Sequence, residues 1–192
     1  MTAKQKTEIV TPPCRLSFPA LFSPAPVMKG ETKVKYQATL LIPPDVDLAP
    51  FQECVKAAMM EKFGELIPLR GRANPLKSGE SVDYDGYAND WTFIRTSSGE
   101  AYPPTVVDQQ RNEIIDPANI YAGCWCRFHI VAYAWSHTSG RGVSFSLNAV
   151  QLVKDGDRLD GRRAAADVFD AVEVENAPAE TPPASDTEAL FG

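Results

Sequence analysis

Along much of the chain, apolar and polar residues alternate with a period of two, which indicates half-buried β-strands. The clearest example is residues 33–42, where one face carries Val34, Tyr36, Ala38, Leu40 and Ile42 and the other carries Lys33, Lys35, Gln37 and Thr39. Further strands are predicted at residues 15–18, 91–96, 106–107, 124–136 and 142–153, and the prolines in residues 19–30 predict a loop there. Residues 137–141 contain a glycine and join the last two strands as a hairpin.

One segment, residues 47–64, instead repeats its apolar residues at the spacing of an α-helix. Asp45 or Asp47 can cap its start, Pro50 is tolerated in its first turn, and Gly64 is a natural stop. The single apolar stripe is typical of a helix that packs over a sheet, rather than of a membrane-binding or cofactor-binding segment.

One helix among many strands and frequent turns predicts a mainly β fold. We expect an OB-fold barrel of about five or more strands, with the helix at about 47–64 covering one end. The predicted organisation is a flexible lead at residues 1–12, one domain at residues 13–163 and a disordered acidic tail at residues 164–192. A body of roughly 150 residues is long enough to bury a sizeable core.

Charge is divided unevenly along the chain. The 192 residues contain 25 acids and 19 bases, but residues 164–192 hold seven of the acids and no base. The body is therefore near neutral, with 18 acids against 19 bases. An acidic tail on a less acidic body is an arrangement of proteins that bind nucleic acid with the body and partners with the tail. A solvated terminus without a function is the alternative.

The segment 124–135 carries the most informative pattern. One face is apolar and partly small, as in a barrel interior: Cys124, Cys126, Phe128, Ile130, Ala132 and Ala134. The other face mixes aromatic and basic residues: Trp125, Arg127, His129, Val131, Tyr133 and Trp135. Aromatic rings stack on bases and cations hold phosphates, so this mixture suits single-stranded nucleic acid. The alternative is that Trp125 and Tyr133 pack under the helix or at an oligomer interface.

On this basis the candidate interface contains two kinds of residue. The candidates for base stacking are Trp125, Tyr133, Trp135, Trp91 and Phe93. The candidates for phosphate contact are Arg127, Arg95, Lys33, Lys35, Arg70, Arg72 and Lys77, although each is equally well explained as an ordinary solvated charge.

Several other classes of function lack the residues they need. The sequence has no P-loop, no Ser–His or Cys–His arrangement and no paired C-x-x-C, so we expect no enzyme, no metal site and no cofactor. No apolar run is long enough to span a bilayer, and the N-terminus does not read as a signal peptide. The four cysteines are expected to be reduced and buried in a cytoplasmic protein, which is the host cytoplasm if a phage encodes the chain.

The order of motifs also resembles a known family. The motifs are Ser17–Phe22, Lys35–Pro43, Pro104–Asp108, Ile120–Cys124 and Arg141–Ser144, followed by Leu147 and Val150–Gln151. This set is similar to phage single-stranded DNA-binding proteins long filed as a domain of unknown function, which are distantly similar to the T7-type phage protein. The resemblance spans roughly residues 14–153.

The resemblance implies an OB-fold that coats single-stranded DNA without sequence preference in phage replication, recombination and repair. It also implies that the acidic tail recruits replication or recombination proteins and competes with DNA for the groove. The tail residues expected to bind partners are Asp186, Glu188, Leu190 and Phe191. Here Gly192 follows the aromatic, which in related tails is terminal. A non-catalytic phage structural or protein-interaction module is the alternative, and the oligomeric state stays open, a dimer included.

Overall fold

The computed structural model describes residues 6–26, 30, 32–84, 86–159 and 161. The chain divides into the units Met1–Arg162 and Arg163–Gly192. The second unit lies outside the described residues, and with it the tail residues Asp186, Glu188, Leu190 and Phe191. The disordered tail and the three-part organisation therefore stay predictions.

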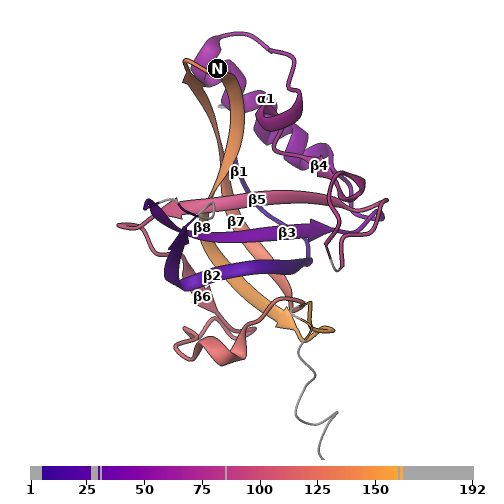
Figure 1. The fold of residues 1–192 in the computed structure, drawn as a ribbon, viewed down its shortest axis with the longest axis vertical. Helices are drawn as coiled ribbons and strands as arrows, with labels where there is room; N and C mark the ends of the chain where they lie inside the picture. Colours follow the sequence, from indigo (N-terminus) through magenta and orange to yellow (C-terminus); the bar gives the residue numbers. More distant parts are fainter. Residues whose placement is uncertain (1–5, 27–29, 31, 85, 160, 162–192) are drawn as a thin grey trace, which may run out of the picture. The chain divides into compact units, whose positions relative to one another are not determined.

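Five strands close into a barrel (Figure 1). They are β2 (Cys14–Pro26), β3 (Val34–Ile42), β5 (Thr92–Gly99), β7 (Trp125–His137) and β8 (Gly140–Lys154). Antiparallel pairs join β7 to β2, β2 to β3, β3 to β5 and β7 to β8, and a parallel pair between β5 and β8 completes the ring. This is the OB-fold predicted from the sequence.

Three short strands extend this sheet. β6 (Thr105–Val107) lies parallel to β8, and β4 (Lys77–Ser78) pairs with β5. β1 (Glu8–Val10) pairs with β7, so the flexible lead predicted for residues 1–12 does not extend over this strand. Thr11 anchors the end of this segment to β7. It is fully buried, and its hydroxyl accepts a hydrogen bond from the backbone N–H of Phe128 at 3.0 Å.

The strand β2 is much longer than the predicted strand 15–18. The prediction of a loop at 19–30 was largely wrong, because β2 continues to Pro26. The Pro residues in this segment suggested a loop, but they lie where β2 pairs with β3 alone and its other side is a sheet edge, a position that tolerates proline. Irregular register between Ser17 and Ala20, and again between Ala20 and Ala25, lets the strand bend around the barrel.

The helix α1 (Ala49–Phe63) confirms the predicted helix. Asp47 accepts a hydrogen bond from the backbone N–H of Ala49 at 2.9 Å. Gly64 ends the helix in the left-handed region, at a φ of 70°, and donates its N–H to the carbonyl of Met60 at 3.0 Å. Three short 3-10 turns, Gly71–Ala73, Gly79–Ser81 and Pro117–Asn119, lie in the connections.

The barrel interior confirms the face predicted for residues 124–134. Cys124, Cys126, Phe128, Ile130 and Ala132 are all buried, and Ala134 is partly buried. They join one core with residues of α1, such as Phe51 and Cys54. A second, smaller cluster covers part of the outside of the barrel, where Leu41, Tyr87 and Phe93 are buried together. The outer face of the barrel is therefore covered by side chains at the end that carries Leu41 and Phe93, and it is exposed at the opposite end.

Candidate nucleic-acid interface

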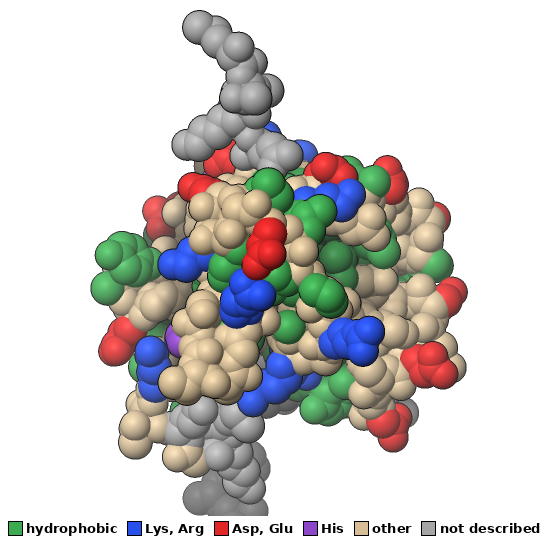
Figure 2. All heavy atoms as spheres, turned by 90° about the horizontal axis from the view of Figure 1, so that it is seen from above, with side chains coloured by type: hydrophobic (Ala, Val, Ile, Leu, Met, Phe, Trp, Pro, Cys, Tyr) green, Lys and Arg blue, Asp and Glu red, His purple; other side chains and the backbone are tan. Residues whose placement is uncertain are grey.

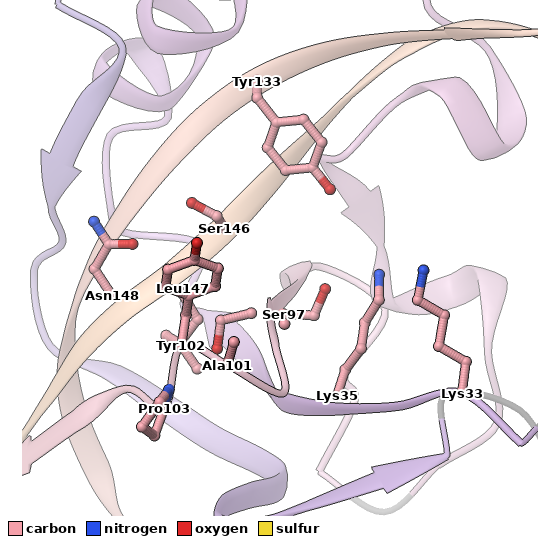
Figure 3. Close-up of a pocket in the computed structure, with 12 residues that line it drawn as sticks. Lys33, Lys35, Ser97, Ala101, Tyr102, Pro103, Tyr133, Ser146, Leu147 and Asn148 are labelled. Atoms are coloured by element: carbon pink, nitrogen blue, oxygen red, sulfur yellow. The ribbon is translucent and has the colours of Figure 1, made fainter.

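The open part of the outer face forms a groove of about 680 Å³ across four strands of the barrel. Figure 3 shows how its side chains lie: Lys33 and Lys35 point the same way from the β3 side, and the Tyr133 ring extends from β7 into the space above them. The groove is lined by Lys33, Lys35, Ser97, Ser98, Gly99, Ala101, Tyr102, Pro103, Tyr133, Ser146, Leu147 and Asn148.

Strand register explains why these residues meet. Lys35 pairs with Gly99 of β5, whose missing side chain leaves space in front of the lysine. Ser97 pairs with Ser146 of β8, and these two short side chains form the low middle of the groove. On the far wall, Tyr133 pairs with Ser144 of β8. Two cationic side chains at the start of β3 and an aromatic ring on β7 thus face each other across a floor of small residues.

The chemistry of the groove is suited to a flexible anion with flat groups. None of the lining residues is acidic, Lys33 is exposed and Lys35 is partly buried. Tyr133 and Tyr102 expose 42% and 75% of their surface, so both rings are open to a base. The hydroxyl of Ser98 is buried and has no hydrogen-bond partner among the described residues.

Further cations lie on the same outer face, along β5. Arg95 pairs with Thr39 of β3, and its guanidinium lies 5.5 Å from the centre of the Phe93 ring. Lys77 of β4 pairs with Phe93, two residues before Arg95 on β5. Burial lowers the pKa of Lys77, and the positive charges of Arg95 and Arg72 lower it further. Arg70 is exposed at the start of the turn that carries Arg72.

Seen from the α1 end of the molecule, Lys and Arg side chains are spread over the surface in separate groups rather than in one basic patch (Figure 2). Arg141 holds the hairpin between β7 and β8 against the end of α1. Arg141 forms an ion pair at 2.9 Å with Glu65, which follows α1. Its guanidinium also lies 5.1 Å from the centre of the ring of Phe63, the last residue of α1. Partnered in this way, Arg141 serves to position the hairpin.

Other predicted residues lie away from the groove. Trp125 is partly buried, with its ring 6.2 Å from that of Trp91 and the Lys154 ammonium 5.2 Å from its centre. Trp125 therefore packs beside Trp91, and its stacking on a base stays a prediction. Arg127 donates a hydrogen bond from Nε to the carbonyl of Thr11 at 3.3 Å.

Two further candidates for stacking have restricted rings. Phe93 is only 1% exposed and lies beneath Tyr87, which excludes it from stacking on a base in this structure. Trp135 donates a hydrogen bond from Nε1 to the Ser144 hydroxyl at 3.1 Å and is stacked with His137. Trp135 also covers Gly142, where any side chain would collide with its ring.

The outward residues of β7 do not act as one platform because the strand is long and irregular. Trp125 and Tyr133 are eight residues apart, which is about 26 Å along a strand. Register shifts after Trp125 and after His129 add bends, so the outward face turns around the barrel as it proceeds. The alternation of residue types was predicted correctly, but alternation does not report this rotation.

Sequence reasoning missed Tyr102. It lies in the turn after β5, where its N–H donates to the carbonyl of Gly99 at 2.9 Å, and no strand or helix periodicity marks it. The available signal was a large aromatic residue within a turn otherwise made of small and polar residues.

The structure also bears on the predictions made for the cysteines, for metal binding and for membrane spans. Cys14, Cys54, Cys124 and Cys126 are free thiols and are buried, as predicted. Among the described residues, no group of His, Cys, Asp and Glu is arranged to hold a metal ion. No helix in the described ranges is both long enough and apolar enough to cross a membrane.

The sequence is similar to a known protein family and to a relative from a phage. The family model described as the single-stranded DNA-binding protein of Enterobacter phage Enc34 matches residues 7–179. Protein p50 of Acyrthosiphon pisum secondary endosymbiont phage 1 is 33% identical over 163 residues, which cover 79% of this chain and 86% of the relative.

Solved structures share the fold at low sequence identity. The single-stranded DNA-binding protein from bacteriophage Enc34 in complex with ssDNA has a TM-score of 0.67 at 22% identity, covering 82% of this chain and 95% of that chain. Gp2.5, a single-stranded DNA-binding protein encoded by bacteriophage T7, has a TM-score of 0.55 at 15% identity, covering 83% and 98%. These matches confirm the resemblance found in the order of motifs, and the chain belongs to the family of the Enterobacter phage Enc34 single-stranded DNA-binding protein.

Proposed function

We propose that this chain binds single-stranded DNA without sequence preference, through the groove across β3, β5, β8 and β7. The observation that carries the proposal is the convergence of two lysines and the Tyr133 ring on one open groove of an OB-fold barrel (Figure 3). Membership of a family described by single-stranded DNA binding supports it.

The proposed contacts divide between the two chemical parts of a DNA strand. Lys33 and Lys35 attract phosphates, and a lysine ammonium is a point charge that does not distinguish one nucleotide from another. Tyr133 and Tyr102 stack on bases, each of which has a π face. Binding is sequence-tolerant for both reasons, and neither step requires a catalytic group.

The cations along β5 extend the proposed path of the strand. Arg95 and Lys77 lie on the same outer face as the groove, and Arg72 adds positive charge near Lys77. Cations that repel one another gain from a phosphate nearby. With about five cations in contact with phosphates, the slope of log K against log salt is expected to be roughly −3 to −4.

A titration of fluorescent oligo-dT tests the proposal. Anisotropy is measured at several salt concentrations, with a duplex of equal length as the comparison. Preference for the single strand with a slope of roughly −3 to −4 supports the proposal. Equal affinity for duplex, or an affinity independent of salt, contradicts it.

We further propose that the protein acts in phage DNA replication, recombination and repair, and that the acidic tail recruits the proteins of those processes. The tail carboxylates, among them Asp186 and Glu188, compete with phosphate for the basic groove at low salt. A chain truncated after Arg163 is then expected to bind oligo-dT more tightly at low salt and to lose partner recruitment. Unchanged affinity and unchanged recruitment after truncation would leave the tail without either role.

A further inference from the structure

An aromatic residue on β2 is held outward by an unusual backbone. Phe18 has a φ of 45°, a left-handed conformation that is an outlier for a bulky side chain. It lies at the irregular register between Ser17 and Ala20, and such bulges commonly turn a side chain away from its expected direction. Its ring is 55% exposed. The fold thus presents an apolar ring to solvent in a strained backbone.

The Phe18 ring belongs to an ordered group of aromatic side chains. Tyr84, which is 49% exposed, meets it edge to face with ring centroids 5.3 Å apart. Both rings rest on buried Tyr87, at 6.5 Å from Phe18 and 5.5 Å from Tyr84. Tyr87 is fixed in turn, because its hydroxyl donates to the Ser17 hydroxyl at 3.2 Å. Phe18 and Tyr84 are therefore two exposed rings that pack on a buried, hydrogen-bonded tyrosine.

Cations lie beside this group. Ser17 pairs with Thr39, and Thr39 pairs with Arg95, which places Arg95 in the row next to Phe18. The positive charge of Arg95 acts on Tyr87, the support of the two rings. Lys77 pairs with Phe93, two residues before Arg95, and Arg72 adds positive charge near Lys77. Exposed rings next to several cations favour a polyanion with flat groups over an apolar protein surface.

We infer that Phe18 and Tyr84 form a second base-stacking site, at the opposite end of the outer face from the Lys33–Tyr133 groove. This inference rests on the proposed function, and it adds a path: the strand runs from the groove along β3 and β5, past Arg95, to Phe18.

The length of that path is set by the sheet. From Lys35 to Thr39, the residue that pairs with Ser17, β3 advances four residues, or about 13 Å. A stacked strand rises about 3.4 Å per nucleotide, so about four nucleotides cover this stretch. With one base at each end, the site holds about six nucleotides, near the lower limit for one OB-fold.

Substitution of Phe18 tests the inference without threatening the fold. Glycine accepts positive φ values readily, so Phe18→Gly removes the ring while suiting the backbone. Phe18→Tyr keeps a stacking ring. We expect Phe18→Gly to weaken binding of fluorescent dT12 at least about fivefold, and Phe18→Tyr to stay within about twofold. The salt slope should not change, because no cation is lost, and the thermal midpoint of Phe18→Gly should not fall.

A matched control and the wild type separate the possible failures. Ile115→Ala also removes an exposed apolar side chain, which is 84% exposed, and should leave dT12 affinity unchanged. If wild-type protein does not bind dT12, the proposed function itself fails. If the wild type binds and Phe18→Gly binds equally well, only the second stacking site is refuted. Unchanged dT12 affinity with altered self-association in sedimentation would likewise refute it, and would assign Phe18 to a protein interface.

Discussion

Removing the two lysines of the groove gives the sharpest test of how the proposed interface works. The perturbation is the double substitution of Lys33 and Lys35 to Gln, which keeps side-chain length and removes two charges. Lys33 is exposed and Lys35 only partly buried, so neither substitution is expected to disturb the core.

The magnitude follows from counting cations on the outer face. Each phosphate neutralised on a single strand contributes about 0.7 to the slope of log K against log salt. The five cations proposed to contact phosphates, Lys33, Lys35, Arg95, Lys77 and Arg72, give a slope of about −3.5, and loss of two reduces it to about −2.1. The affinity of the variant is then about 25-fold lower at 0.1 M salt and about fivefold lower at 0.3 M, and the two lines converge near 1 M.

The assay is anisotropy of fluorescent dT12 at four salt concentrations, with a control of equal charge. Lys56→Gln with Lys62→Gln removes two positive charges from α1, where Lys56 forms an ion pair with Glu53 at 2.7 Å. This control should keep the wild-type slope within about 0.3. An unchanged slope in the groove variant, or an equal change in both variants, would show that net charge rather than the groove determines binding.

Three further outcomes are expected. Tyr133→Ala should weaken dT12 binding about tenfold at constant salt slope while Tyr133→Phe retains it, and equal losses in both would argue against stacking. Trp125→Ala, if Trp125 stacks on DNA as its sequence position suggested, should weaken binding tenfold or more; a folded variant with unchanged affinity and a lower thermal midpoint would assign Trp125 to packing against Trp91. Burial raises the pKa of Cys14 to about 12, so at pH 8 its thiolate fraction should be roughly a thousandfold below that of a free thiol, and fast native labelling by a thiol reagent would contradict this.

Much of the barrel could be predicted because its signals are local. The alternation of Val34 to Ile42 follows directly from one face being buried, and the position of Gly64 follows from a left-handed helix end. The prolines of β2 wrongly predicted a loop, since the effect of Pro24 or Pro26 depends on whether a neighbouring strand needs the missing N–H of the proline. Edge position is a property of the sheet and is not written in the local sequence.

The candidate site was harder to predict because it depends on which strands become neighbours. Lys35 and Tyr133 meet only after β5 and β8 pair between them, which no local pattern reveals. Phe93 looked like an outward aromatic and does point outward, but the segment containing Tyr87 folds over it. Phe18 escaped notice because its exposure depends on a bulge with positive φ, which glycine would signal and phenylalanine does not.

The parallel pairing of β5 with β8, which closes the barrel, has a kinetic consequence. β5 and β8 pair in parallel through Thr96 with Phe145 and Ser97 with Ser146, a short contact between distant parts of the chain. Parallel pairs are slightly weaker per residue, and contacts of high sequence separation form slowly. Since Ser97 and Ser146 also form the low middle of the groove, a ligand held between Lys35 and Tyr133 spans this pairing. A ligand bound in this way holds β5 and β8 together, so we expect an occupied groove to slow the opening of the barrel.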